Sequence, residues 1–300
     1  MKKRVCLFVL LSVFKLVLLP GQMKEDSMPG IGLIEISQVN QDKSYVTFPT
    51  DIGNIEPLWF EANLIPNFYI RQSDNSRLLG VLTPQIILRM YQERSYPVRT
   101  PSYMPQITIY YMLKELDEAR KLSVFGRWAH HSNGQDGAFY TEAGQINVKS
   151  GDFSTNYLES GLIFTNINTR LHAYQFFKTS FEVHPEGWNG KDLEGIYGKY
   201  RWHQAVSIYR IPAKQLNSSK KKAGYSLRAE TNWMFGDLNN WDSYSLKRLN
   251  FSLTLYYHPN FLEDIGFFAQ YYHGSDYYNI YFDHRLDVLR FGIMTEKLRF

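Results

Sequence analysis

The strongest constraint on the fold of this chain is a repeated alternation of polar and apolar residues that begins near Glu56. Ile107 and Ile109, for example, alternate with Gln106 and Thr108. A period of two is typical of a β-strand whose two faces meet different surroundings, and no segment shows the longer period of an amphipathic helix. Extended segments of about 10–15 residues recur, separated by turns rich in Gly, Asn and Asp. We therefore predict an all-β fold.

Eleven segments have this extended character, and a twelfth strand is predicted within residues 279–285 or within residues 41–48. Residues 23–55 otherwise show no strong period, so we predict an irregular N-terminal extension ahead of a single domain over residues 56–300. The eleven predicted strands cover residues 58–71, 78–91, 104–113, 122–132, 154–166, 173–183, 193–209, 225–235, 246–258, 265–273 and 288–300.

The composition helps to decide between a soluble β-sandwich, which alternation alone would also allow, and a membrane barrel. The chain contains 22 Tyr, 20 Phe and 6 Trp, yet its mean hydropathy is only −0.35. Alternating strands can cross a bilayer at low mean hydropathy because every second residue faces the lumen, and aromatic side chains collect at the two membrane interfaces. Turns of unequal length, tyrosines near strand ends and the terminal Phe300 favour the same interpretation. The sequence therefore predicts a single antiparallel transmembrane β-barrel of eleven or twelve strands.

The N-terminal residues predict export from the cytoplasm. Residues 1–22 begin with a basic stretch, continue with an apolar run and end near Pro20-Gly21, which is typical of a secretory signal peptide. A transmembrane anchor is the alternative, although the apolar run is short for a membrane span. Removal of these residues lowers the formal net charge from +4 to zero and removes Cys6, the single cysteine. These features exclude a disulfide scaffold and disfavour a general nucleic-acid-binding role.

One stretch carries side chains with the spacing of a hydrolytic site. His130 and Ser132 are two residues apart, so on a strand they share a face, with the imidazole beside the hydroxyl. If Asn156 begins the next strand, its amide can reach the far nitrogen of the His130 ring and fix the tautomer. A nucleophile, a base and an orienting group are the components of nucleophilic catalysis.

The alternation also predicts the face on which this site lies. If His130 and Ser132 point outward, the even-numbered residues from 122 to 128 also point outward, and most of them are apolar. Arg127 and His131 then point inward. On the predicted partner strand, the face that holds Asn156 is again the more apolar one. A site on the apolar outer wall of a barrel would face membrane lipid.

Two motifs resemble those of the outer-membrane phospholipase A family. His130-His131-Ser132-Asn133-Gly134, followed by Ser154-Thr155-Asn156, is similar to the H-x-S-N-G and S-x-N elements of that family. Ser95-Tyr96-Pro97-Val98-Arg99, followed by Tyr103-Met104-Pro105, is similar to its S-x-P-x-R and Y-x-P segment. The resemblance implies a twelve-stranded barrel in the bacterial outer membrane that hydrolyses glycerophospholipids and is activated by homodimerisation.

The resemblance implies a role for each residue of the motif. Ser132 would accept the acyl group, His130 would be its general base, and Asn156 would orient the imidazole. The backbone amide of Gly134 would contribute to the oxyanion hole, together with water on a bound calcium ion.

The same resemblance implies a Ca²⁺ site built from oxygen ligands. Ser95 matches a ligand supplied by the partner subunit, and the backbone carbonyl of Gln135 matches a second ligand. The chain departs from the family because Gln135 stands where the family has Arg, and because the segment between the site's serine and asparagine is about a dozen residues longer. The remaining ligand stays open between Asp152, which is four residues before the asparagine, and Asp136, which is nearer the serine.

Two alternative functions remain from the sequence alone. A lipid A deacylase also uses an H-x-S element but orients its histidine with a glutamate, and Glu142 is available ten residues after Ser132. Deacylase barrels are much shorter, which disfavours this alternative. The second alternative is a non-enzymatic, porin-like barrel in which Ser132 and His130 are inert.

Overall fold

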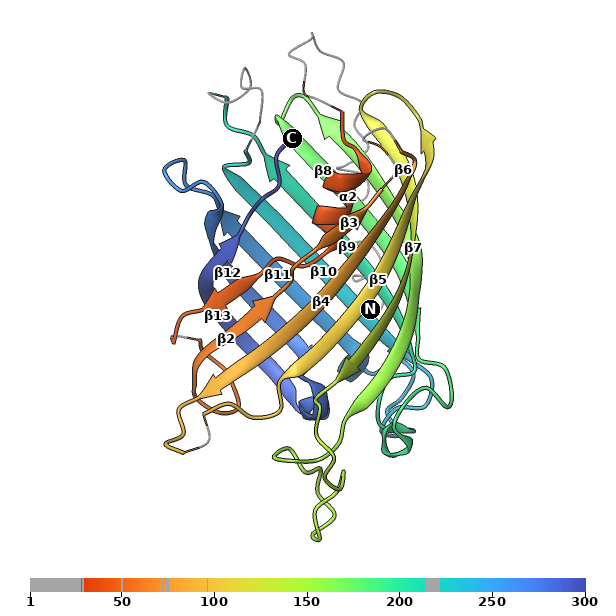
Figure 1. Ribbon diagram of the computed structural model, residues 1–300, viewed down its shortest axis with the longest axis vertical. Helices are drawn as coiled ribbons and strands as arrows, with labels where there is room; N and C mark the ends of the chain where they lie inside the picture. Colours follow the sequence, from red (N-terminus) through yellow and green to blue (C-terminus); the bar gives the residue numbers. More distant parts are fainter. Residues whose placement is uncertain are drawn as a thin grey trace, which may run out of the picture.

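The computed structural model describes residues 28, 30–49, 51–71, 73, 76–95, 97–213 and 222–300. Tilted strands wind around a central space to form a tall barrel (Figure 1). The signal peptide predicted over residues 1–22 lies outside the described residues. Within the described ranges, no helix is both long enough and apolar enough to cross a membrane.

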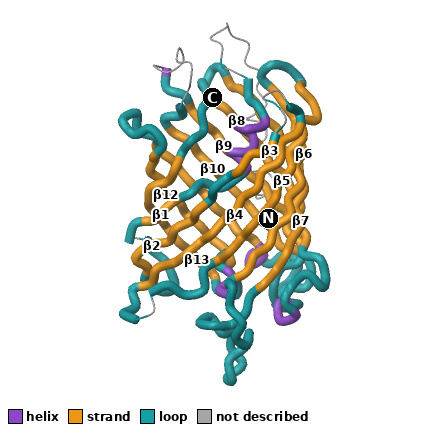
Figure 2. The backbone as a smooth tube through the Cα atoms, in the orientation of Figure 1, coloured by secondary structure: helices purple, strands orange, loops and turns teal. Residues whose placement is uncertain are grey.

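Strands dominate the described part of the chain, and helical segments are short (Figure 2). The α-helix α2 spans Leu33–Asn40, and 3-10 turns lie at Lys191–Leu193, Leu246–Arg248 and Asn279–Tyr281. The strands are β1 Tyr45–Thr47, β2 Leu58–Leu64, β3 Phe68–Ile70, β4 Leu78–Tyr91, β5 Ser102–Glu115, β6 Arg120–Ser132, β7 Ser154–Asn168, β8 Ala173–Val183, β9 Tyr200–Arg210, β10 Tyr225–Phe235, β11 Leu249–Tyr257, β12 Ile265–Ser275 and β13 Arg285–Thr295.

The sheet closes on itself through its first strands. From β4 to β13 each strand pairs with the next, β1 joins β13 to β2, and β2 pairs directly with β4. These pairings close a ring of twelve antiparallel strands, to which the short β3 adds along the edge of β4. The prediction of a single twelve-stranded antiparallel barrel is confirmed.

β2 and β3 form one interrupted strand. Both pair with β4 in the same register, since Leu64 lies opposite Ile86 and Phe68 lies opposite Leu82. The interruption contains Pro66, which has no backbone N–H to donate to a ladder. The single strand predicted over residues 58–71 is therefore present as two segments in one register, and the predicted continuity is wrong.

Other predicted boundaries are corrected by the structure. The segment predicted to be irregular contains α2 and β1, and β1 is the strand predicted within residues 41–48. The strand predicted from residue 193 begins at Tyr200, because the residues before it form a loop and a 3-10 turn. The strand predicted from residue 246 begins at Leu249, again after a 3-10 turn.

The C-terminal residues are also placed differently from the prediction. β13 ends at Thr295 rather than at Phe300. Beyond it, Leu298 is buried, and the ring of Phe300 stacks on that of Tyr174 with 3.9 Å between centroids. Tyr174 is itself fully buried, so the tail turns into the barrel and packs there instead of extending the sheet.

The two faces of the wall differ as the alternation predicts. Outward residues of β5, β6 and β7 are exposed and apolar, including Ile107, Ile109, Trp128, Leu158 and Leu162. Inward residues of the same strands are buried and often polar, including Thr108, Ser123, Glu159 and Thr165. An apolar outer surface around a polar interior is the architecture of an outer-membrane β-barrel, whose outer wall contacts lipid.

The interior holds two apolar clusters, one toward each end of the barrel. The first contains α2 and the tail around Leu298, packed against Tyr110 and Tyr174. The second contains loop residues such as Phe153 and Tyr278. A polar region with a cavity of about 370 Å³ lies between them.

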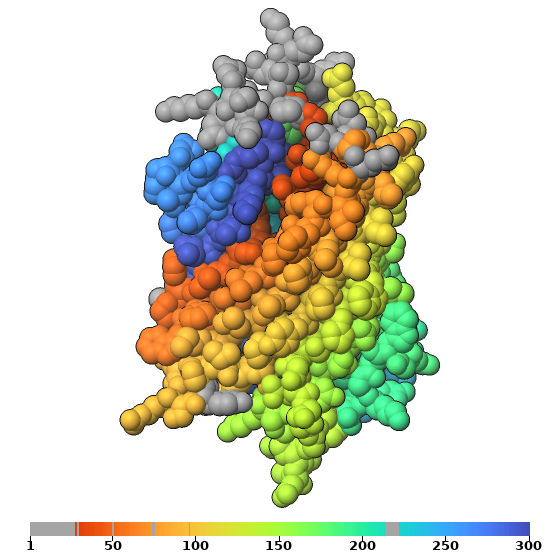
Figure 3. All heavy atoms as spheres, viewed as in Figure 1, coloured from red at the N-terminus to blue at the C-terminus, as the bar shows by residue number. Residues whose placement is uncertain are grey.

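The loops near the second cluster project from one end of the molecule. The loop after β6 extends furthest there (Figures 1 and 3). The loops at this end include those after β4, β6, β8, β10 and β12, with described residues 92–95, 97–101, 133–153, 184–199, 236–248 and 276–284.

Candidate functional site

The predicted nucleophile and base lie at the end of β6, beside the beginning of β7. The antiparallel register places His130 opposite Asn156 and Ser132 opposite Ser154. His130, Ser132 and Asn156 are each half-buried on the outward face, whereas His131 is buried on the inward face. The strand phase predicted from the sequence is therefore confirmed at this end of the barrel wall.

Asn156 contacts the ring of His130 in the way the sequence predicts. His130 Nδ1 lies 3.0 Å from Asn156 Oδ1. Asn156 Nδ2 donates a hydrogen bond to the carbonyl of Trp188 at 2.6 Å, which requires the amide oxygen to face the histidine. An amide oxygen can only accept, so Nδ1 of the neutral ring carries the hydrogen and Nε2 keeps its lone pair.

The free nitrogen of His130 is the one that a serine nucleophile needs. Ser132 lies two residues along the same face of β6. Within the described chain the Ser132 hydroxyl makes no direct hydrogen bond with the ring. Catalytic hydrogen bonds are often long before substrate binds, so shared face and ring orientation are the relevant features.

Asn133 and Gly134 turn the chain away from the strand directly after the serine. Asn133 is buried, and its Oδ1 accepts hydrogen bonds from the backbone amides of Gln135 and Phe153, at 3.2 and 3.0 Å. Gly134 has φ of +65°, a conformation that disfavours residues with a Cβ atom. The turn leaves the Gly134 backbone exposed beside the strand end, where an oxyanion donor would be needed.

The long loop after β6 brings two candidate calcium ligands together. Asp152 donates its backbone N–H to the carbonyl of Gly137 at 2.9 Å, so Asp152 lies beside the segment that contains Gln135 and Asp136. Both aspartates are exposed, and neither carboxylate has a hydrogen-bond or ion-pair partner among the described residues. The available donors are oxygens, which suits a hard cation such as Ca²⁺.

Ser95 does not join these donors within one chain. It is exposed in the turn that follows β4, and β5 separates that strand from β6. The described residues contain no group of three or more acidic, histidine or cysteine side chains that could hold a metal ion. In the sheet, β4 and the turn that holds Ser95 are therefore one strand removed from the end of β6.

Glu142, the orienting group of the deacylase alternative, lies elsewhere. It is exposed in the turn formed by residues 141–144 of the long loop. The nitrogen of His130 that it would have to contact already faces Asn156. The geometry favours the asparagine as the orienting group.

Sequence reasoning missed two residues that contact the site. Trp188 and Asn189 belong to the loop after β8, and both bond to Asn156. They lie more than thirty residues after Asn156, and no local sequence pattern predicts a contact between residues so far apart.

Comparison with known proteins gives a structural likeness but no sequence match. No family model matches the chain, and no curated relative does. The Escherichia coli outer membrane phospholipase A structure superposes with a TM-score of 0.56 at 15% identity, covering 85% of this chain and 92% of that chain. The fold is that of outer membrane phospholipase A. An active-site mutant of the same Escherichia coli protein covers 92% of this chain and 94% of that chain, with a TM-score of 0.56 at 14% identity.

A second outer membrane phospholipase, from Salmonella typhi, was solved as a dimer with bound calcium. It superposes with a TM-score of 0.56 at 15% identity, covering 85% of this chain and 90% of that chain. The chain thus shares nearly the full extent of the outer membrane phospholipase A fold. The chemistry of its candidate site has to be argued from the residues of this chain.

Proposed function

We propose that this protein is an outer-membrane phospholipase A that hydrolyses acyl esters of glycerophospholipids at Ser132. The observation that carries the proposal is the pairing of His130 with Asn156 beside Ser132 on the apolar outer wall. The likeness to outer membrane phospholipase A supports it. Substrate would reach the site from the outer leaflet, which normally holds little glycerophospholipid, so activity should depend on loss of lipid asymmetry.

The reaction would proceed in two halves. The Ser132 oxygen attacks the ester carbonyl carbon while its proton passes to His130 Nε2. The tetrahedral intermediate then collapses, and the departing lysophospholipid oxygen takes that proton. In the second half water attacks the acyl-serine with the same transfer of protons, and fatty acid leaves.

The negative charge on the intermediate requires donors that are already in place. The Gly134 amide lies at the turn after Ser132, and each such donor contributes roughly 10²–10³ in rate. Calcium, held by the Gln135 carbonyl, Asp152 and Ser95 of the partner subunit, would supply positive charge near the oxyanion. We place Asp152 ahead of Asp136 as the carboxylate ligand because it lies two residues before Ser154, the first residue of β7.

The proposal is tested by fatty-acid release from phospholipid in detergent micelles by refolded protein. Ser132→Ala should abolish release, whereas Ser154→Ala, which lies directly opposite on β7, should retain most of it. A calcium chelator should abolish release by the wild type, and added Ca²⁺ should restore it. No release from a folded wild-type protein would refute the hydrolase and leave a non-enzymatic barrel. Fatty-acid release that persists in the presence of the chelator would show that the reaction does not require calcium.

A further inference from the structure

The first residues of β7 lack a partner strand on the β8 side. β8 ends at Val183, opposite Leu158, so the ladder stops two residues before it reaches Asn156. The loop after β8 returns along this open edge, and the Gly190 N–H donates to the Ser154 carbonyl at 2.9 Å. The loop therefore takes the place of a strand beside the site.

The side chain of Asn189 supplies the hydrogen-bond acceptor that the backbone of a neighbouring strand would otherwise supply. Its Oδ1 accepts hydrogen bonds from the Asn156 backbone N–H at 3.1 Å and from the Thr155 hydroxyl at 2.7 Å. Its Nδ2 donates to the Pro185 carbonyl at 3.2 Å, which fixes the orientation of the amide. Asn156 is thus held at its backbone by Asn189 and at its side chain by the Trp188 carbonyl.

Thr155 connects this outer loop to the interior of the barrel. It is fully buried, and its Oγ lies 2.7 Å from His184 Nδ1. The same oxygen lies 2.7 Å from Asn189 Oδ1, so Thr155 contacts both the outer loop and a histidine of the lumen.

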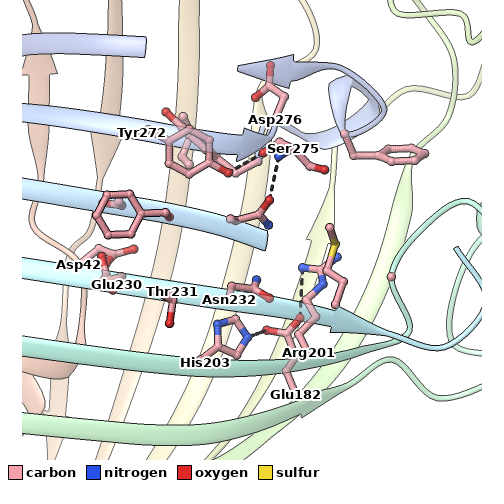
Figure 4. Close-up of a pocket in the computed structure, with 18 of the residues that line it drawn as sticks. Asp42, Glu182, Arg201, His203, Glu230, Thr231, Asn232, Tyr272, Ser275 and Asp276 are labelled. Carbon is pink, nitrogen blue, oxygen red and sulfur yellow. Dashed lines mark hydrogen bonds and ion pairs between the residues drawn. The ribbon is translucent and has the colours of Figure 1, made fainter. Parts of the chain in front are cut away.

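The path ends in a charged group on the lumen side. His184 Nε2 faces Glu182 at 2.8 Å, and Glu182 also lies 3.2 Å from Arg201 and 3.0 Å from His203. Figure 4 shows Glu182, Arg201 and His203 together on the wall of the internal cavity. This buried charged group therefore contacts the outer loop through His184 and Thr155.

We propose that Asn189 is a positioning residue for the site and acts through Asn156 on His130. Its two accepted hydrogen bonds hold the start of β7 in register with the end of β6. That register keeps Asn156 Oδ1 3.0 Å from His130 Nδ1 and leaves Nε2 free toward Ser132. The kinetic consequence rests on the proposed hydrolase function, whereas the effect on the His130 tautomer does not.

The first test is kinetic and uses three variants of the full chain in phospholipid–detergent micelles. Asn189→Ala removes the acceptor and should lower kcat about tenfold with little change in KM. Asn189→Asp keeps an acceptor oxygen toward Asn156 and Thr155 and should retain most of kcat. Glu186→Gln removes a surface ion pair with Lys199 in the same loop and should behave as the wild type. An equal loss of kcat in Asn189→Ala and Glu186→Gln would overturn the proposal, since general loosening of the loop would then explain the effect.

The second test needs no activity. Nitrogen NMR of ¹⁵N-histidine-labelled protein reports the ring tautomer of His130, assigned by its loss in His130→Gln. We expect the Nδ1–H tautomer in the wild type and Asn189→Asp, and mixed tautomers in Asn189→Ala. An unchanged tautomer in folded Asn189→Ala would overturn the proposal. A changed tautomer in a protein without Ser132-dependent hydrolysis would sustain the positioning role and refute the proposed function.

Discussion

At the residue scale, the orientation of one amide determines which nitrogen of His130 can act as a base. Asn156→Ala removes the acceptor for Nδ1–H and should lower kcat roughly 10- to 1,000-fold, because the ring then samples the wrong tautomer. Asn166→Ala is the matched control, since Asn166 lies on the same strand and its side chain donates to Gln175, away from the site. The comparison is made by initial rates of fatty-acid release. Equal rates for wild type and Asn156→Ala would remove Asn156 from the mechanism.

Gly134 gives a second prediction at this scale. A Cβ atom there would sit at a left-handed backbone conformation and 3.3 Å from the Tyr103 ring, so Gly134→Ala should displace the turn after Ser132 and lower kcat. Gly144→Ala carries the same kind of backbone strain, with φ of +74°, but meets nothing within 4 Å. Rate measurements on both variants separate the two effects. A similar loss of activity in both would show that strain in the loop, and not the turn at the site, is responsible.

The pair His130–Ser132 and its outward direction could be predicted because strand phase is a local property of the sequence. Asn156 could be predicted because it lies near the start of the adjacent strand. Trp188 and Asn189 could not, since their contact with Asn156 depends on where β8 ends and how its loop returns. The proximity of Asp152 to Asp136 likewise depends on the fold of a loop, to which no sequence period applies.

At the element scale, the alternation predicted the long strands well because successive residues face lipid and lumen in turn, and the two environments favour apolar and polar side chains respectively. It did not predict α2, whose eight residues are too few for a clear helical period. It also extended β13 to Phe300, since apolar residues that pack in the lumen resemble apolar residues that face lipid. The alternation thus predicts that a segment is a strand, but it does not predict whether its apolar residues face lipid or the lumen.

The helix α2 gives a prediction about stability. Ile36 is fully buried in the lumen cluster, so Ile36→Ala should leave a cavity and cost about 2–4 kcal/mol of unfolding free energy. Ile109→Ala makes the same change on the outer wall, where detergent or lipid can fill the space, and should cost less. Urea unfolding in micelles compares the two. An equal or smaller effect at Ile36 would show that α2 is only loosely packed in the barrel.

At the scale of the whole molecule, the proposed role of Ser95 as a calcium ligand predicts a site shared between two protomers. Ser95→Ala and Ser132→Ala should each be impaired as homodimers, whereas a mixed dimer has one protomer with an intact Ser132 and a partner with an intact Ser95. Refolding an equal mixture should therefore restore up to about a quarter of wild-type activity, given random pairing. The measurement is fatty-acid release by the mixture against each variant alone. Activity equal to the mean of the two variants would rule out sharing of Ser95.

The central claim is that an outward-facing Ser132, activated by His130, is the nucleophile. The most direct measurement is mass-spectrometric mapping of the adduct formed when the refolded protein, with calcium, reacts with a long-chain alkylsulfonyl fluoride. We predict a single modified residue, Ser132, with labelling much slower in Asn156→Ala and unchanged in Asn166→Ala. A folded wild-type protein that remains unlabelled, or that is labelled at another residue while Ser132 stays free, would contradict the account.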